Sequence, residues 1–177
     1  MKNVALLLLS IVLFSCNTKA QSKKGADLFP ITKTEAEWKA TLSPQEYYIL
    51  REKGTERPFS SEFNKNYNKG TYICAACDTP LFKSEYKFDS GSGWPSFDRE
   101  IKANVEFSTD NDLLYTRTEE HCASCGGHLG HVFNDGPANT TGLRHCINGS
   151  ALKFIPIKMM DEKEYNYRCC FKINYKN

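Results

Sequence analysis

The sequence is short of three features that would place it in a common class of protein. Its 23 basic and 21 acidic residues leave a net charge of only +2, whereas a protein that follows a nucleic-acid duplex needs a large cationic excess. It has no apolar run near the roughly 20 residues of a membrane-spanning helix. No linker divides residues 34–177, and the one repeat is a duplicated cysteine pair. With 40% hydrophobic residues, we expect one ordered globular domain that binds no nucleic acid.

Cysteine, by contrast, is abundant. The chain has eight cysteines in 177 residues, too sparse for a miniprotein held by disulfides alone and too many to be incidental. Four form two Cys-x-x-Cys pairs, one lies near the N-terminus, one stands alone, and two are adjacent near the C-terminus. Such different settings indicate different tasks.

The N-terminus resembles an export signal. Lys2 precedes an apolar run from Val4 to Phe14, and a small residue then precedes Cys16, as in bacterial lipoproteins. We therefore expect residues 1–15 to be a signal peptide and residues 16–33 a flexible tether lipidated at Cys16. The protein would be an exported cell-envelope lipoprotein, periplasm-facing or in the outer membrane. The alternative is an ordinary cleaved signal and a soluble periplasmic or secreted protein.

Residues 34–177 have the pattern of a mainly β domain that opens with two short helices. Thr34 and Ser43 each stand three residues before a glutamate, which is the capping-box pattern. The second helix should end near Lys53, with Gly54 in the left-handed conformation. Short runs rich in β-branched and aromatic residues follow, separated by turn residues. The expected strands are 70–74, 85–88, 105–108, 113–118, 131–133, 144–147, 152–155 and 167–173.

The paired Cys-x-x-Cys motifs predict a metal site. Four thiolates at this spacing can complete a tetrahedral zinc shell, which leaves no open position and makes the metal structural. Export favours a second interpretation, two disulfides, and a redox dithiol is a third. The spacing favours zinc, and the four ligands would be Cys74, Cys77, Cys122 and Cys125.

Cys146 is a candidate nucleophile. Arg144 stands close to it in the sequence and would favour the thiolate. His128 and His131 could donate protons near neutral pH, but three residues apart on a strand they face opposite sides unless Gly130 allows a bend. These residues alone support equally a buried structural cysteine with two structural histidines.

Trp94 lies in a segment rich in glycine and serine, next to Pro95. Such a segment favours a turn, from which the indole could form the wall of a small apolar pocket. A tryptophan in the core is the alternative.

These clusters together resemble the methionine-R-sulfoxide reductases of type B. The matching stretches are 57–59, 70–77, 80–82, 87–97, 122–137 and 142–150. The resemblance implies two coiled antiparallel β-sheets with short N-terminal helices, a structural Zn²⁺ on the four paired cysteines, and no organic cofactor. It implies thiol-dependent reduction of the R epimer of methionine sulfoxide in peptides and proteins.

The resemblance also assigns roles to single residues. Cys146 would attack the sulfoxide sulfur and become a sulfenic acid, while His128 and His131 position and protonate the departing oxygen. Trp94 would receive the methyl group. The positions that shape the pocket or support the thiolate are Phe133, Arg144 and Asn148.

The sequence departs from the family at a cysteine that often resolves the sulfenic acid, because Ser92 occupies that position. An external thiol could act directly, Cys170 or Cys169 could resolve it, or both could be plain strand residues. His145 and Gly149 also replace the usual tyrosine and serine.

The expected partners are an oxidised peptide or protein and a thioredoxin-like reductant. We expect a monomer that contacts the membrane only through its lipid. The rival functions are a non-catalytic zinc-ribbon-like binding module and a disulfide-stapled secreted binding protein.

Overall fold

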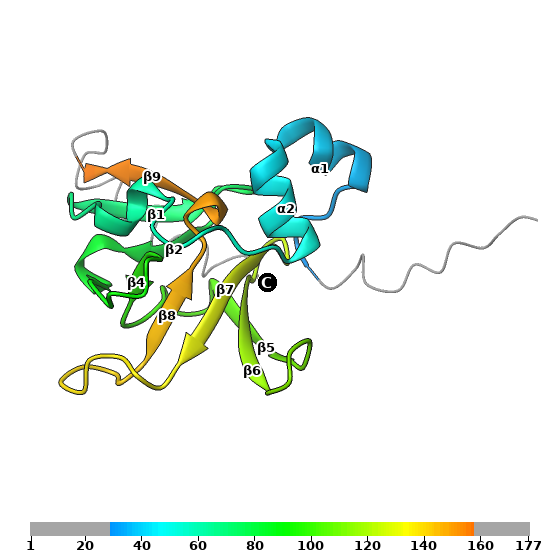
Figure 1. Ribbon diagram of the computed structural model, residues 1–177. Coiled ribbons are helices and arrows are strands. Elements are labelled where there is room, and N and C mark those ends of the chain that lie inside the picture. The colour runs from blue at the N-terminus through cyan, green and yellow to red at the C-terminus, as the bar shows by residue number, and fades with distance from the viewer. Residues whose placement is uncertain (1–28, 158–177) are drawn as a thin grey trace, which may run out of the picture.

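The computed structural model describes residues 29–157 (Figure 1). The expected signal peptide, Cys16, Cys169, Cys170 and the strand at 167–173 lie outside this range. No helix within it is long and apolar enough to cross a membrane.

Two short helices open the described chain, α1 (Glu35–Thr41) and α2 (Pro44–Glu52). Both expected capping boxes are present, with Thr34 and Ser43 as the caps. The expected left-handed Gly54 is wrong, because Lys53 takes that conformation at φ 56°. Gly54 serves close packing instead, since a Cβ there would lie 2.3 Å from the Tyr48 ring.

After α2, the described residues form two antiparallel sheets, which confirms the expected mainly β fold. The smaller has the order β2-β1-β9 and the larger the order β3-β4-β8-β7-β6-β5 (Figure 1). The strands are β1 (Gly70–Cys74), β2 (Pro80–Lys83), β3 (Lys87–Phe88), β4 (Ser96–Phe97), β5 (Val105–Asp110), β6 (Arg117–Cys122), β7 (His128–Phe133), β8 (Arg144–Ile147) and β9 (Leu152–Pro156). The described residues also include three 3₁₀ turns. The turn η1 (Glu62–Lys65) precedes β1, η2 (Ser84–Tyr86) lies between β2 and β3, and η3 (Gly149–Ala151) lies between β8 and β9.

Two of the expected strands, 70–74 and 144–147, have the predicted bounds. The strand expected at 113–118 is wrong: residues 111–116 form the turn between β5 and β6, and β6 begins at Arg117. Asp110 pairs with Arg117 across the hairpin and accepts the Asp112 backbone N–H at 2.8 Å. These polar contacts hold an apolar segment, which resembles a strand in composition, as an exposed turn.

The core lies between the two sheets. Phe82 of the small sheet stacks on Phe97 of the large one with ring centroids 4.4 Å apart, and Tyr72 packs on Phe97 at 5.0 Å. None of these three rings is exposed to solvent. Along β8 the side chains alternate, so His145 and Ile147 are buried while Cys146 is on the other face. That alternation places the candidate nucleophile on the face opposite the core.

Candidate active site

Four strands of the large sheet bring the candidate residues into one row. Ser96 of β4 pairs with Cys146 of β8, Cys146 pairs with His131 of β7, and His131 pairs with Glu119 of β6. Residues directly opposite each other on antiparallel strands project from the same face. The thiol of Cys146 therefore lies between a hydroxyl and an imidazole.

A β-bulge brings His128 to the same side as His131. Along β6 the pairing passes from Glu120–Gly130 to His121–His128, so Leu129 is an extra residue on β7. A bulge re-aims the side chain beside it, and the two imidazole rings meet with centroids 5.4 Å apart. The bend that the sequence left open is this bulge.

Gly130 has a separate role, which is close packing of β7 on β8. A Cβ at Gly130 would lie 2.0 Å from the carbonyl oxygen of Cys146. Any side chain would force the two strands apart, and the distance between Cys146 and the histidines would grow with them.

A buried carboxylate orients His128. Its Nδ1 lies 2.8 Å from Oε1 of Glu119, whose Oε2 is 2.7 Å from Nζ of Lys53. Burial alone would raise the pKa of Glu119, but the hydrogen bonds from His128 and Lys53 outweigh it and lower the pKa to about 2. An ionised acceptor holds the proton on Nδ1. The Nε2 atom of His128 is buried and has no hydrogen-bond partner within residues 29–157, so it remains free for a ligand.

A second carboxylate holds His131. Its Nε2 lies 2.7 Å from Oδ2 of Asp110, which also accepts a 2.6 Å hydrogen bond from Arg117. The backbone N–H of Asp112, followed by His131, lowers the pKa of Asp110 to about 2. Burial lowers the pKa of His131, which favours the neutral ring.

Cys146 is a half-buried thiol beside an immobilised cation. Burial raises its pKa, and the charge of Arg144 acts in the opposite direction. Arg144 is held by Asp135 through hydrogen bonds of 2.8 and 3.0 Å and lies over the Phe133 ring, 4.5 Å from its centroid. The expected pocket residues Phe133 and Arg144 are thus joined to each other next to the thiol.

The turn that carries Trp94 lies beside Cys146 on the β4 side of β8. Ser92 Oγ is 3.9 Å from Cys146 Sγ, and Ser90 links the hydroxyls of Ser92 and Ser96 at 2.8 and 2.7 Å. The half-buried Trp94 donates from Nε1 to the carbonyl of Glu56 at 3.1 Å. The turn expected from the sequence therefore exists, and Trp94 is not a residue of the buried core.

Asn148 links two backbone segments near the site. It is buried, accepts the backbone N–H of Glu56 and donates to the carbonyl of the bulge residue Leu129, both at 3.0 Å. It thus connects the segment that anchors Trp94 with the bulge that orients His128. Both hydrogen bonds go to backbone groups, and the expected pocket or thiolate role of Asn148 stays a prediction.

The four paired cysteines lie together where β1 and β6 end, at Cys74 and Cys122. Their sulfur atoms all lie within 4.8 Å of one another, with Cys74–Cys125 at 3.8 Å and Cys77–Cys122 at 3.6 Å. Thiolates about 2.3 Å from zinc in a tetrahedron are about 3.8 Å apart, whereas a disulfide needs about 2.05 Å. All four are free thiols, so the geometry fits a metal site and excludes the paired disulfides.

Similar turns form the two halves of this metal site. Asp78 N–H bonds to the Cys74 carbonyl and Gly126 N–H to the Cys122 carbonyl, at 2.9 and 2.8 Å. Asp78 and Gly126 are both left-handed, with φ of 57° and 67°. The chain reverses there, which lets both sulfurs of a pair face one ion.

The carboxylates of the site were not predicted from the sequence. Glu119 and Asp110 orient the histidines, and Glu56 binds the backbone N–H groups of Gly149 and Ser150 at 2.6 and 2.9 Å. The available signal in the sequence was the adjacent pair Glu119 and Glu120. Neighbouring side chains in a β-strand point to opposite faces, so one of the two acids must face the interior.

Comparison with known proteins places this site in context. Residues 42–156 match the SelR domain. The chain is 52% identical over 127 residues to peptide methionine sulfoxide reductase MsrB of Leptospira interrogans, covering 71% of this chain and 96% of that protein. It is 54% identical to the MsrB of Thiobacillus denitrificans, covering 70% and 94%. It is 45% identical to the chloroplastic peptide methionine sulfoxide reductase B1 of Arabidopsis thaliana, covering 82% and 75%.

Proposed function

The chain belongs to the methionine-R-sulfoxide reductase B family, and from that premise we propose that it reduces methionine R-sulfoxide in peptides and proteins with Cys146 as the nucleophile. The observation that carries the assignment of the nucleophile is the cross-strand pairing of Cys146 with His131. It places a thiol and a carboxylate-bound imidazole side by side on a face of the sheet that the core does not fill.

In the proposed first step, the Cys146 thiolate attacks the sulfoxide sulfur. The bond between that sulfur and its oxygen breaks, and oxygen is transferred to Cys146. The products are the thioether and a cysteine sulfenic acid, so the substrate is reduced while Cys146 is oxidised. The proton that the Cys146 thiol gives up passes to an imidazole of the pair His128 and His131, and the resulting imidazolium protonates the departing oxygen. Glu119 and Asp110 stabilise that imidazolium.

Two neighbours favour the attacking thiolate. Arg144 supplies a fixed positive charge and Ser92 supplies a hydroxyl, and both oppose the rise in the Cys146 pKa that burial causes. The Trp94 indole offers an apolar surface for the methyl group. The site therefore combines an apolar wall with a proton-donating corner, as a thioether stem with one polar oxygen requires.

The most direct test replaces the nucleophile. We expect Cys146→Ser to lose about 10³-fold or more of the turnover of a peptide containing methionine R-sulfoxide, with dithiothreitol as reductant. Its unfolding midpoint should match that of the wild type, and neither protein should turn over the S epimer. Equal turnover by the two proteins would refute the role of Cys146.

We propose that an external thiol, supplied in the cell by a thioredoxin-like protein, reduces the sulfenic acid directly. The thiols of residues 29–157 are Cys146 and the four cysteines of the metal site, and Ser92 stands beside Cys146. Two thiols would be oxidised to a disulfide, which restores Cys146 and releases water. After one turnover without reductant, dimedone should label Cys146. A disulfide from Cys146 to Cys169 or Cys170 would contradict this proposal.

We propose that the four-cysteine cluster holds one structural zinc ion. Such an ion would join the end of β1 to the end of β6 and contribute directly to folding. Metal analysis of the purified protein should give one equivalent of zinc, and Cys77→Ser should lower both the zinc content and the unfolding midpoint. Full stability without metal would contradict this role.

We further propose that the protein is exported, anchored through lipid on Cys16, and repairs oxidised exported proteins. The support is the N-terminal sequence alone. Mass spectrometry of the mature N-terminus should find an acylated Cys16, and Cys16→Ala should release the protein from membranes. An unmodified N-terminus beyond Cys16 would favour the soluble alternative.

A further inference from the structure

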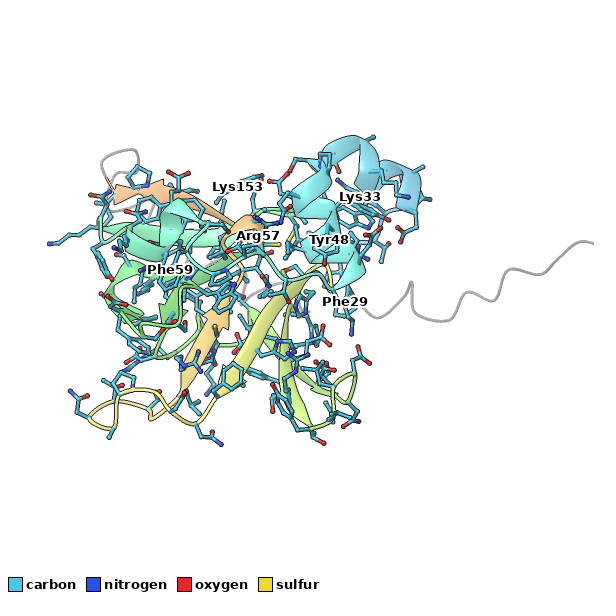
Figure 2. All side chains as sticks on the ribbon, in the orientation of Figure 1. Phe29, Lys33, Tyr48, Arg57, Phe59 and Lys153 are labelled. Atoms are coloured by element: carbon cyan, nitrogen blue, oxygen red, sulfur yellow. The ribbon has the colours of Figure 1, made fainter. Side chains whose placement is uncertain are left out.

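An exposed aromatic side chain, Phe59, lies next to the proposed site in an unfavourable backbone conformation. Its φ is 63°, in the left-handed region that a bulky L-residue rarely adopts. Its exposed fraction is 66%, so packing against the core does not account for the ring. Figure 2 shows it at the surface, on the loop that also carries Arg57.

The backbone alone does not need phenylalanine here. Glycine adopts the left-handed conformation without strain, and it would also keep the 2.7 Å hydrogen bond from the Phe59 N–H to the carbonyl of Gly93. An aromatic residue adds strain and exposes apolar surface to water. Strained residues of this kind occur preferentially at functional sites.

The position of Phe59 connects it to the proposed site. Its ring lies against Gly93, because a Cβ built there would come within 3.0 Å of the ring. Gly93 follows Ser92, whose hydroxyl is 3.9 Å from Cys146 Sγ, and precedes Trp94. The exposed Phe59 ring therefore packs on the backbone that joins Ser92 to Trp94.

We propose that Phe59 is a docking platform for an apolar side chain next to the oxidised methionine in a polypeptide substrate. The inference rests on the proposed function and adds a preference for sequence context. A substrate methionine attached to a chain must lead its flanking residues out of the site past the rim. At the rim, the exposed Phe59 ring buries apolar surface only when a residue next to the oxidised methionine has an apolar side chain.

The test compares three substrates of the full-length protein: N-acetyl-methionine R-sulfoxide, a pentapeptide with glycine on both sides of the oxidised methionine, and one with leucine on both sides. For the wild type, kcat/KM should be highest with the leucine peptide. In Phe59→Gly, the ratio of the leucine peptide to the glycine peptide should fall about five- to tenfold, mainly through KM. Phe59→Tyr should keep the ratio.

Stability and a matched control separate docking from a structural role. Because glycine suits a positive φ, Phe59→Gly should unfold within about 3 °C of the wild type. Leu114→Ser, which changes a fully exposed apolar residue at the tip of the β5–β6 hairpin, should leave the ratio unchanged. An unchanged ratio in Phe59→Gly, or an equal fall in Leu114→Ser, would overturn the docking role. Absence of turnover with all three substrates would instead refute the proposed function.

Discussion

The two faces of the large sheet carry the same kind of residue pair in different surroundings. On the face of Cys146, His128 and His131 bind Glu119 and Asp110, and each carboxylate also binds a cation. On the core face, His145 lies 2.8 Å from Glu120, and neither side chain is exposed. Glu119 and Glu120 are adjacent in β6, so strand alternation alone sends one to each face.

The two faces differ in how well the charges are compensated. Lys53 and Arg117 reach the outer carboxylates from partly exposed positions, and the pKa values of Glu119 and Asp110 fall to about 2. On the core face, burial raises the pKa of Glu120. Within residues 29–157, no well-directed hydrogen bond satisfies the Glu120 oxygens or the His145 nitrogens. In the proposed mechanism the outer pairs serve proton transfer, whereas we expect the inner pair mainly to affect stability.

The largest expected effect is on catalysis at the outer face. We expect His128→Gln and His131→Gln each to lower kcat for a methionine R-sulfoxide peptide by about 10²- to 10⁴-fold, because each removes a proton donor. Their unfolding midpoints should change little. His121→Gln is a matched control, since His121 lies on the neighbouring strand β6 and is likewise near a carboxylate, Glu106, at 3.6 Å. A comparable loss of kcat in His121→Gln would show that the effect is not specific to His128 and His131.

The next effect is on stability at the inner face. Glu120→Ala removes one partner of a buried pair, and we expect it to lower the free energy of unfolding by about 3–5 kcal/mol. The double variant Glu120→Val with His145→Phe replaces the pair by apolar groups and should recover the wild-type value to within about 1 kcal/mol or exceed it. Urea unfolding at pH 7 measures both. Folded Glu120→Ala should keep most of its kcat, and a loss as large as that of His131→Gln would place the pair in the mechanism.

The smallest effect is the pH dependence of stability, which should have opposite signs on the two faces. The folded pKa values of Glu119 and Asp110 are lowered, so their contribution is present above their unfolded pKa values of about 4 and is lost as pH falls toward 2. Burial alone would lower the pKa of His145, but the neighbouring carboxylates Glu120, Glu100 and Asp98 outweigh it and raise the pKa.

The contribution of His145 is therefore complete below about pH 6.5 and is lost as pH rises through the folded value. The free energy of unfolding should decline on the alkaline side, where His145 contributes about 1.4 kcal/mol per pH unit at most. The raised pKa of Glu120 adds to this decline, because its buried carboxyl loses stability as pH rises above its unfolded pKa of about 4. Urea unfolding at a series of pH values measures the decline. The double variant at positions 120 and 145 should lose the alkaline decline attributed to His145 and keep the acid one. An unchanged alkaline decline would show that His145 is not its source.

Much of the fold was predictable because its signals are local. The capping boxes at Thr34 and Ser43 depend on side chains three residues apart, and the strand at 144–147 stands between the turn-forming residues Gly142 and Gly149. The apolar segment at 113–116 was misassigned because composition does not show that polar contacts of Asp110 close a hairpin there. Glu119 and Asp110 were missed because their histidine partners lie on another strand.

The sequence by itself determined the class of the protein: a mainly β domain, two cysteine pairs spaced for one metal ion, and a lone cysteine with two histidines upstream. Only the tertiary structure decided how these residues meet. The bulge at Leu129 brings His128 beside His131, the β7–β8 register puts His131 opposite Cys146, and alternation sends Glu119 outward and Glu120 inward. The physical reason is that a shift of one residue in strand pairing reverses every side chain, and long-range pairing sets that register.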